Sequence, residues 1–334
     1  MAERQVVVVT GATGGVGRAV AREFAKHGAA VGLLARGRAG LEATAREVRE
    51  LGGEACACPT DVAEFEQVQA AAAVIEERLG PIDVWVNNAM TTVFSFFDDV
   101  KPEEYERATR VTYLGTVWGT KVALERMLPR DRGTIVLVGS ALAYRGIPLQ
   151  APYCGAKHAI KGFWESVRTE LRNRGSGVHV PMVQLPGMNT PQFNHCESKM
   201  PRHPQPVPPI YQPEVAARSI YWASQHRRRE LYVGFPTVYT IVGNKVAPWL
   251  AERYLAKTAV KGQQTDQTVP GDRPNNLFEP LDAERDEGAH GIFDDQAHGR
   301  SPQAWLSRHR RSSSLAAGAA FAVATALVLR TASD

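Results

Sequence analysis

The chain has 334 residues, which suits one large α/β domain with additions or two modest domains. Hydrophobic residues make up 44% and charged residues 22%, so the chain can bury a sizeable core, and a formal charge of +4 is too small to favour nucleic acid as a partner. The four cysteines show neither framework spacing nor paired CxxC motifs, so we expect reduced thiols in a cytoplasmic compartment rather than disulfides or a zinc site.

Short apolar runs alternate with segments of helical periodicity through the first two-thirds of the chain. This alternation predicts βαβ units in a doubly wound α/β fold with a parallel sheet. The run at 6–9 is β-branched throughout, as expected for a strand covered on both faces. The predicted strands are 6–9, 29–35, 54–58, 82–86, 133–138, 178–184 and an edge strand at 230–234. The first predicted helix carries Val16, Val20 and Phe24 on one face. The other predicted helices are 41–51, 65–79, 102–128, 152–172 and 214–225.

Two regions interrupt this alternation. The stretch 200–213 holds six prolines, so it cannot form a regular helix or a central strand. From residue 261 the chain is polar and rich in Asp, Gly, Gln and Pro, which indicates an extended arm or linker rather than a second core. We therefore expect a main α/β domain (1–260), an arm (261–312) and a hydrophobic C-terminal segment (313–330).

A glycine-rich stretch, residues 10–17, lies between the first strand and the first helix. Gly11 permits a tight turn, Gly15 lets the backbone approach a pyrophosphate, and Gly17 lets helix and strand pack closely. The helix N-terminus then offers unpaired N–H groups to phosphates. In this strand–loop–helix setting the stretch predicts a dinucleotide site. Its expected contacts are Gly11, Thr13, Gly14, Gly15, Val16 and Gly17.

The end of the second strand bears on which dinucleotide binds. Folds that prefer NAD place a carboxylate there for the ribose 2′-hydroxyl, whereas this chain has Arg36 and Arg38. A guanidinium forms a charge-assisted pair with a 2′-phosphate, so the sequence favours NADP(H) as the cofactor. The alternative, that both arginines are solvated loop charges, stays open.

Two later strand ends supply further expected cofactor contacts. Asp61 and Val62 follow the third strand, where the carboxylate can accept from the adenine amine or cap the next helix, and both roles stay open. Asn88 and Ala89 follow the fourth strand, where a carboxamide can bridge neighbouring strands and a small residue lets the cofactor lie close.

Three side chains suggest the chemistry. Tyr153 and Lys157 are four residues apart in a helical stretch and share one face, and Ser140 ends the fifth strand. A phenol has a pKa of about 10, and an ammonium about 4 Å away contributes about 4 kcal/mol at an effective dielectric of about 20, enough to lower that pKa to about 7. The pattern predicts hydride transfer between a carbonyl and an alcohol, with Tyr153 as acid/base and Ser140 holding the carbonyl oxygen.

With the glycine loop, Asn88-Ala89, Ser140 and the Tyr153/Lys157 pair in this order, the chain resembles the short-chain dehydrogenase/reductase family over about residues 5–234. The resemblance implies a one-domain Rossmann fold, an NADP-binding catalytic domain and a homo-oligomer. It also implies that Ser140 orients the substrate, while Lys157 binds the nicotinamide ribose and lowers the pKa of Tyr153. The cofactor contacts that it adds are Tyr153, Lys157, Pro186, Gly187 and Thr190.

The chain departs from the family pattern at three places. Thr112 stands where the family has a fourth catalytic residue, an asparagine, and a hydroxyl cannot reproduce both carboxamide functions. Met90 stands where a glycine is usual, and the turn that ends at Thr190 is one residue short. Thr112 and Met90 support a second hypothesis, a cofactor-binding scaffold or redox sensor with the same fold and little turnover.

Apolar residues near the strand ends favour a lipophilic ketone, aldehyde or alcohol as the substrate, although core packing is the alternative for these side chains. No His or Cys spacing supports a metal site, neither at 195–196 nor at 290–298. The expected lining residues are Phe94, Phe96, Phe97, Leu142, Tyr144 and Phe193, with the proline-rich loop behind them.

Two further segments bear on membranes. Residues 315–329 carry no charge and are flanked by arginines, but they fall short of the roughly 20 residues that span a bilayer. A C-terminal membrane anchor with the enzyme on the cytoplasmic side, and a helix packed on the chain's own domain or a partner subunit, both stay open. We expect the segment 246–260 to cover the core, with docking on a membrane surface as the alternative.

Overall fold

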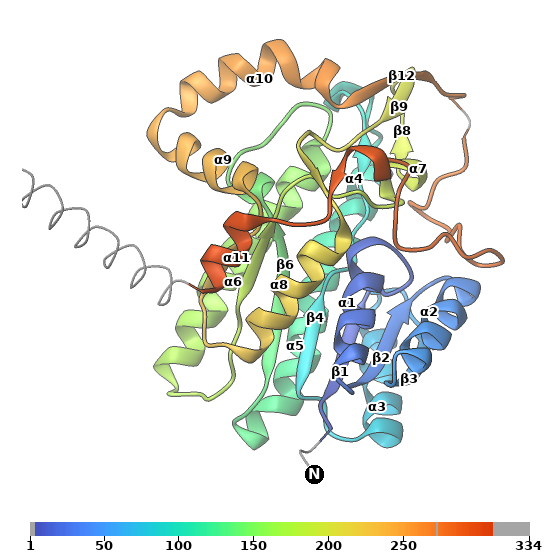
Figure 1. Ribbon diagram of the computed structural model, residues 1–334, viewed down its shortest axis with the longest axis vertical. Coiled ribbons are helices and arrows are strands. Elements are labelled where there is room, and N and C mark those ends of the chain that lie inside the picture. The colour runs from blue at the N-terminus through green and yellow to red at the C-terminus, as the bar shows by residue number, and fades with distance from the viewer. Residues whose placement is uncertain (1–3, 272, 310–334) are drawn as a thin grey trace, which may run out of the picture.

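A seven-stranded parallel sheet forms the centre of the molecule in the computed structural model, which describes residues 4–271 and 273–309 (Figure 1). The strand order is β11-β7-β6-β4-β1-β2-β3. From β1, the strands β2 and β3 are added on one side and β4, β6, β7 and β11 on the other, so the topological switch point lies between β1 and β4, as in a doubly wound fold. The predicted α/β class and the edge position of the last strand are confirmed. The strands are β1 (Val6–Thr10), β2 (Ala30–Ala35), β3 (Glu54–Pro59), β4 (Val84–Asn87), β6 (Thr134–Ser140), β7 (Met182–Leu185) and β11 (Glu230–Tyr232).

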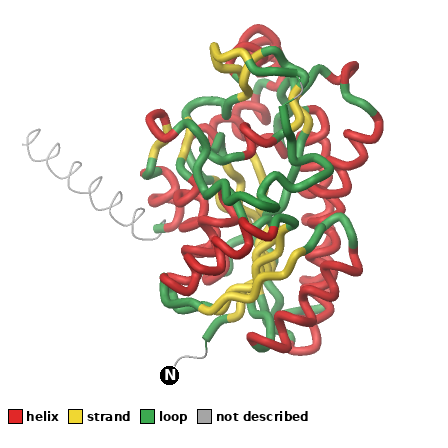
Figure 2. The backbone as a smooth tube through the Cα atoms, turned by 90° about the vertical axis from the view of Figure 1, so that its right-hand side faces the viewer, coloured by secondary structure: helices red, strands yellow, loops and turns green. Residues whose placement is uncertain are grey.

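Helices cover both faces of this sheet (Figures 1 and 2). One face packs against α1 (Gly15–Lys26), α2 (Arg38–Glu50) and α8 (Pro213–Gln225). The other packs against α3 (Phe65–Leu79), α5 (Gly115–Met127) and α6 (Ala151–Asn173). Alternate residues of β1 enter the two cores, which is why its β-branched run carries no polar face.

The helix predicted over 102–128 is three consecutive pieces. A π-helical turn, η2 (Arg110–Leu114), joins α4 (Pro102–Thr109) to α5. The turn brings Thr112 into the interior, where its side chain is fully buried. Such turns are frequent at functional sites because they reposition one side chain within a helix.

Two helices, α9 (Phe235–Val246) and α10 (Pro248–Gly262), stand beyond the carboxyl ends of the strands (Figure 1). The expectation that 246–260 covers the core is wrong, because α10 buries little more than Ala259. Val246 is 79% exposed and Trp249 64% exposed, so the apolar face of this helix pair is turned outward.

The segment that follows α10 is extended and lies against the main domain. We call residues 264–301 the C-terminal arm; it contains β12 (Gln264–Thr268), η5 (Asp294–Gln296) and β13 (Ala297–His298) and leads into α11 (Pro302–Arg308). Leu277, Ala289 and Phe293 are buried, so the arm is anchored by apolar contacts. In Figure 1 it descends on the side of α1 and α2 and then returns toward α11.

Short elements complete the described fold. Three small two-stranded pairings tie loops together: β5 (Val93–Phe94) with β8 (Glu197–Ser198), β9 (Arg202–Pro204) with β12, and β10 (Ile210–Tyr211) with β13. The remaining elements are η1 (Phe97–Asp99), η3 (Leu128–Arg130), η4 (Ala141–Ala143) and α7 (Gln192–His195).

The hydrophobic C-terminal segment lies outside the described residues, so both of its predicted roles remain predictions. Within residues 4–271 and 273–309, no helix has the length and apolar character needed to cross a membrane.

Candidate active site

A cavity of about 750 Å³ runs along the carboxyl ends of the strands, beneath α9 and α10. Most of the site residues predicted from the sequence meet in its wall, although they come from seven separate segments of the chain. Gly17 and Thr112 are not in the wall and act from behind it. The predicted residues that line it are Gly11, Thr13, Gly14, Gly15, Val16, Arg36, Asp61, Val62, Asn88, Ala89, Ser140, Tyr153, Lys157, Pro186, Gly187 and Thr190.

The glycine loop forms one part of this wall. Gly11 has a φ of +65° and Gly15 a φ of +52°, a left-handed conformation that favours glycine. At Gly15 a Cβ would lie 2.9 Å from the methyl group of Thr190, and at Gly17 it would overlap the carbonyl oxygen of Gly11. The loop therefore needs glycine both for its turn and for the close packing of α1 on β1, as the sequence predicts.

Asn88 ties two strand ends together. Its side-chain amide donates to the carbonyl oxygen of Thr10 at 3.0 Å, and its backbone N–H donates to the Thr10 hydroxyl at 2.9 Å. The carboxamide thus bridges the ends of β4 and β1, as predicted. Ala89 follows and lies against Gly11, which keeps this part of the cavity open.

Arg36 is in the wall at the end of β2, but its guanidinium already has partners. It donates to the backbone carbonyl oxygens of Phe278, at 2.7 Å, and of Asn276, both in the C-terminal arm. Burial lowers the pKa of Arg36, and the nearby Arg107 guanidinium lowers it further. The solvated-loop alternative is therefore wrong for Arg36, since this side chain is desolvated and bonded to the arm.

Asp61 accepts two hydrogen bonds. One carboxylate oxygen accepts from the backbone N–H of Ala63 at 3.0 Å, and the other pairs with Arg107 at 2.6 Å. Because α3 begins at Phe65, Asp61 closes the turn before the helix rather than capping the helix itself. Arg107 also donates to the carbonyl oxygen of Leu277, so it links Asp61 to the arm.

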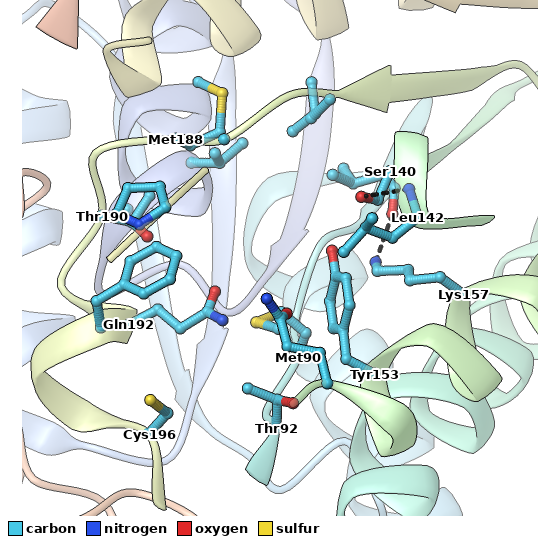
Figure 3. A pocket seen from close by; sticks show the side chains of 18 of the residues that line it. Met90, Thr92, Ser140, Leu142, Tyr153, Lys157, Met188, Thr190, Gln192 and Cys196 are labelled. Carbon is cyan, nitrogen blue, oxygen red and sulfur yellow. Dashed lines mark hydrogen bonds between the residues drawn. The ribbon is translucent and has the colours of Figure 1, made fainter. Parts of the chain in front are cut away.

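Tyr153, Ser140 and Lys157 lie together on one side of the cavity, opposite Thr190 and Gln192 (Figure 3). Tyr153 and Lys157 come from the first turns of α6, and Ser140 is the last residue of β6. Burial raises the pKa of Tyr153 to about 12, and a hydrogen bond with the Ser140 side chain partly opposes that rise. The phenol is therefore in its protonated form near neutral pH.

Lys157 is buried, and its ammonium donates to the carbonyl oxygen of Val138 at 2.7 Å. Its Nζ lies 5.5 Å from the centroid of the Tyr153 ring. Burial lowers the pKa of Lys157 to about 8. The predicted lowering of the Tyr153 pKa by this ammonium is not found: burial raises the pKa, and the group that opposes this rise is Ser140.

Thr112 acts on the backbone behind the cavity. Its hydroxyl donates to the carbonyl oxygen of Thr91 at 2.8 Å and accepts from the backbone N–H of the same residue at 3.1 Å. One hydroxyl thus both donates and accepts, which the sequence argument did not expect of threonine. The bonds fix the loop that carries Met90, whose side chain lines the cavity as predicted (Figure 3).

The predicted substrate-lining residues divide into two groups. Leu142, Phe193 and residues 206–208 of the proline-rich loop do line the cavity. The others do not: Phe94 is buried in a separate cluster, Phe96 and Phe97 are exposed, and the Tyr144 hydroxyl donates to Glu230 at 2.7 Å.

Residues of α9 and α10 were missed by the sequence argument. Tyr239, Thr240, Tyr254 and Leu255 line the cavity from above, although Tyr254 is also 65% exposed. Their helical periodicity predicts an amphipathic element, but nothing in it indicates which other element that face contacts.

The histidines near the cavity have ordinary partners. His195 is 3.7 Å from Glu287, and burial lowers its pKa. His290 contacts Glu214 and Asp294. In the part of the chain that the structure describes, no three His, Cys, Asp or Glu side chains are grouped so as to hold a metal ion.

The comparisons with known proteins agree with this geometry. The family model for short chain dehydrogenases matches residues 5–201. The uncharacterized oxidoreductase YxnA of Bacillus subtilis (strain 168) is 32% identical over 276 residues, which are 81% of this chain and 75% of that protein. Estradiol 17-beta-dehydrogenase 11 of Mus musculus is 32% identical over 252 residues, which are 75% of this chain and 81% of that protein.

A solved structure shares the fold. The crystal structure of a metagenomic short-chain oxidoreductase in complex with NADP is 28% identical, has a TM-score of 0.58 and covers 69% of this chain and 96% of its own. The family match spans more than half of the described chain and contains the glycine loop, Ser140, Tyr153 and Lys157. This protein belongs to the short-chain dehydrogenase family.

Proposed function

We propose that this protein is an NADP(H)-dependent oxidoreductase that interconverts a lipophilic ketone or aldehyde and its alcohol, with Tyr153 as the general acid/base. The observation that carries the proposal is that Ser140, Tyr153 and Lys157 share one cavity with the glycine loop. The apolar side chains of Leu142 and Phe193 in the same wall support a lipophilic substrate.

The residues present fit a dinucleotide. Gly11 and Gly15 leave room for backbone to approach a pyrophosphate, and the N-terminus of α1 directs its free N–H groups at the same place. Arg36 at the end of β2 supports NADP(H) over NAD(H), because a guanidinium matches a phosphate. The NADP bound to the metagenomic relative is consistent with this preference.

The chain's own residues bind the carbonyl and deliver the proton. When bound, the reduced nicotinamide supplies the hydride, which leaves negative charge on the substrate oxygen. The hydroxyls of Ser140 and Tyr153 would bind that oxygen, and Tyr153, protonated because its pKa is about 12, would give it a proton. The charge left on the phenolate would then be stabilised by the Lys157 ammonium one helical turn away.

The test is NADPH oxidation measured with a panel of apolar ketones and aldehydes, with NADH and charged or sugar carbonyls as comparisons. We expect Tyr153→Phe to lower kcat/KM by about 10²–10⁴, the usual contribution of a positioned acid/base, while the Kd for NADPH stays within about twofold. Tyr144→Phe is the matched control, because the Tyr144 hydroxyl faces Glu230 outside the cavity.

The scaffold or sensor hypothesis predicts a different result. In that case the wild type would bind NADPH yet turn over no member of the panel, and Tyr153→Phe would leave the biological effect of the protein unchanged. Retained turnover in Tyr153→Phe would contradict the role that we give to the phenol.

A further inference from the structure

The C-terminal arm covers the place where β2 ends and α2 begins. Arg36 donates to the carbonyl oxygens of Asn276 and Phe278, as described above. The first backbone N–H groups of α2 also have arm partners, because Ala39 donates to the carbonyl of Ala283 and Gly40 to that of Asp282, each at 3.2 Å. The arm therefore satisfies both the guanidinium and the helix N-terminus.

The Asp282 carboxylate lies at the same helix end. A Cβ on Gly37 would overlap this carboxylate, and a Cβ on Gly40 would lie 2.5 Å from one of its oxygens. Gly37 is the residue before the helix and Gly40 is in its first turn. An anion is therefore already placed where the helix dipole favours negative charge.

These are the groups that a ribose 2′-phosphate would use. In a dinucleotide-binding fold the residue at the end of the second strand contacts the 2′ position, and an arginine there accommodates the phosphate. A helix N-terminus is likewise suited to a phosphate. Because Arg36, the N–H groups of α2 and the space between Gly37 and Gly40 are taken by the arm, a 2′-phosphate and this conformation of the arm exclude each other.

We propose that Asp282 of the C-terminal arm is a determinant of cofactor choice, acting as a built-in competitor for the 2′-phosphate of NADP(H). The proposal rests on the dinucleotide site of the proposed function and adds a residue that lies far from the strand end in sequence. NADP(H) binds only when the loop 278–283 moves off the α2 terminus and the Arg36 side chain leaves its two carbonyl partners. NAD(H), which has a hydroxyl at the 2′ position, leaves that segment in place.

Contacts on either side of Asp282 hold the rest of the arm while this segment moves. Asp286 pairs with Arg18, whose guanidinium also binds Glu47 at 2.9 Å. Upstream, Arg273 donates to the carbonyl oxygen of Phe193 at 3.2 Å and to that of Cys196 at 2.6 Å. Leu277 is buried as well, so the displaced stretch is the short loop between Leu277 and Asp286.

The test compares the affinities of the full-length chain for NADPH and NADH, measured by the change in nicotinamide fluorescence on binding. In Asp282→Asn we expect the Kd for NADPH to fall about tenfold, because the competing charge is gone, while the Kd for NADH changes by less than about twofold. Glu284→Gln is the matched control, since Glu284 is exposed two residues further along the same loop. It should change neither Kd.

Hydrogen exchange supplies a second readout that does not need the variant. We expect NADPH to increase amide exchange in residues 278–283 of the wild type and NADH to leave it unchanged or slow it. Equal effects of Asp282→Asn on both affinities, or the same exchange with both cofactors, would overturn the proposal. If the wild type binds neither dinucleotide, the proposed function fails as well, so the two failures can be told apart.

Discussion

Lys157 carries its amino group on a buried side chain in the wall of the cavity. The side chain is buried, and burial lowers the pKa of its ammonium from the ordinary value to about 8. Between pH 8 and the ordinary pKa, the unfolded chain holds a proton on this lysine and the folded chain does not. The contribution of Lys157 to the free energy of unfolding therefore rises with pH between pH 8 and the ordinary pKa of lysine. Relative to Lys157→Met, we expect the wild type to gain about 2 kcal/mol in its free energy of unfolding from about pH 7.5 to about pH 9.5.

The measurement is urea unfolding of both proteins at the two pH values. Lys161→Met serves as the control, because Lys161 lies one turn further along α6 and pairs with Glu165 near the surface. If the free energy of unfolding changed with pH by the same amount in the wild type and in Lys157→Met, the result would contradict burial of a titrating amine at this position.

At the scale of elements, the start of α1 is fixed by how closely it approaches β1. A Cβ at Gly17 would overlap the Gly11 carbonyl and come within 2.6 Å of the Asn88 amide, and both of these residues line the cavity. We expect Gly17→Ala to cost about 1–3 kcal/mol in unfolding free energy through overpacking, and to weaken dinucleotide binding, because the helix must move away from the loop. Thermal unfolding and NADPH titration measure the two effects.

Gly162→Ala is the counterpart within α6. Gly162 is exposed, has open space around it and lies inside a helix, so alanine there should be neutral or stabilise by up to about 1 kcal/mol. If Gly162→Ala lowered the free energy of unfolding as much as Gly17→Ala, helix glycines would stabilise this fold for a reason other than close packing.

At the scale of the whole molecule, a buried charge helps to tie the arm to the main domain. The Arg18 side chain is 3% exposed and lies between Glu47 of α2 and Asp286 of the arm. Both carboxylates raise the pKa of Arg18 and together outweigh the effect of its burial. We expect Asp286→Asn to leave the fold intact but to release the arm, so that trypsin cleaves after Arg300, which Ser301 follows, several times faster than in the wild type.

Asp295→Asn is the control for that digestion, since Asp295 is an exposed acidic residue of the same arm. Mass analysis of the first fragments identifies the cleavage sites. Unchanged cleavage in Asp286→Asn would mean that the apolar contacts of Leu277 and Phe293 are enough to hold the arm.

The accuracy of the sequence predictions follows from how local each signal is. The strands of the sheet and the helices that cover it were predicted because a buried parallel strand shows a short continuous apolar run, and an amphipathic helix shows its period within a few residues. Tyr153 and Lys157 were paired for the same reason, since both lie on one helix face. The exposed Phe97 and the cavity-lining Phe193 look alike in sequence, and only packing separates them.

The arm escaped prediction for a related reason. Its path has no periodicity and is fixed by pairs such as Arg36 with Phe278, which are 242 positions apart. Arg36 was predicted to bind the cofactor and does lie in the cavity wall, but its partner in the arm could not be inferred from a polar stretch without periodicity. The π-helical turn at Thr112 likewise depends on contacts with the distant Thr91 loop.

The contacts of Gln263, the residue just before the arm, bear on how a dinucleotide and a carbonyl compound would affect each other's binding. Gln263, which is fully buried, donates to the carbonyl oxygen of Pro148 and accepts from Gln150 at 2.6 Å, immediately before the helix that carries Tyr153. One continuous piece of chain therefore touches Gln150, in the cavity wall near Tyr153, at Gln263 and touches Arg36, at the end of β2, at Asn276. Thermodynamic linkage then makes the coupling reciprocal. If binding of a dinucleotide changes the protein's affinity for the carbonyl compound through this piece of chain, binding of the carbonyl compound changes the affinity for the dinucleotide by the same factor.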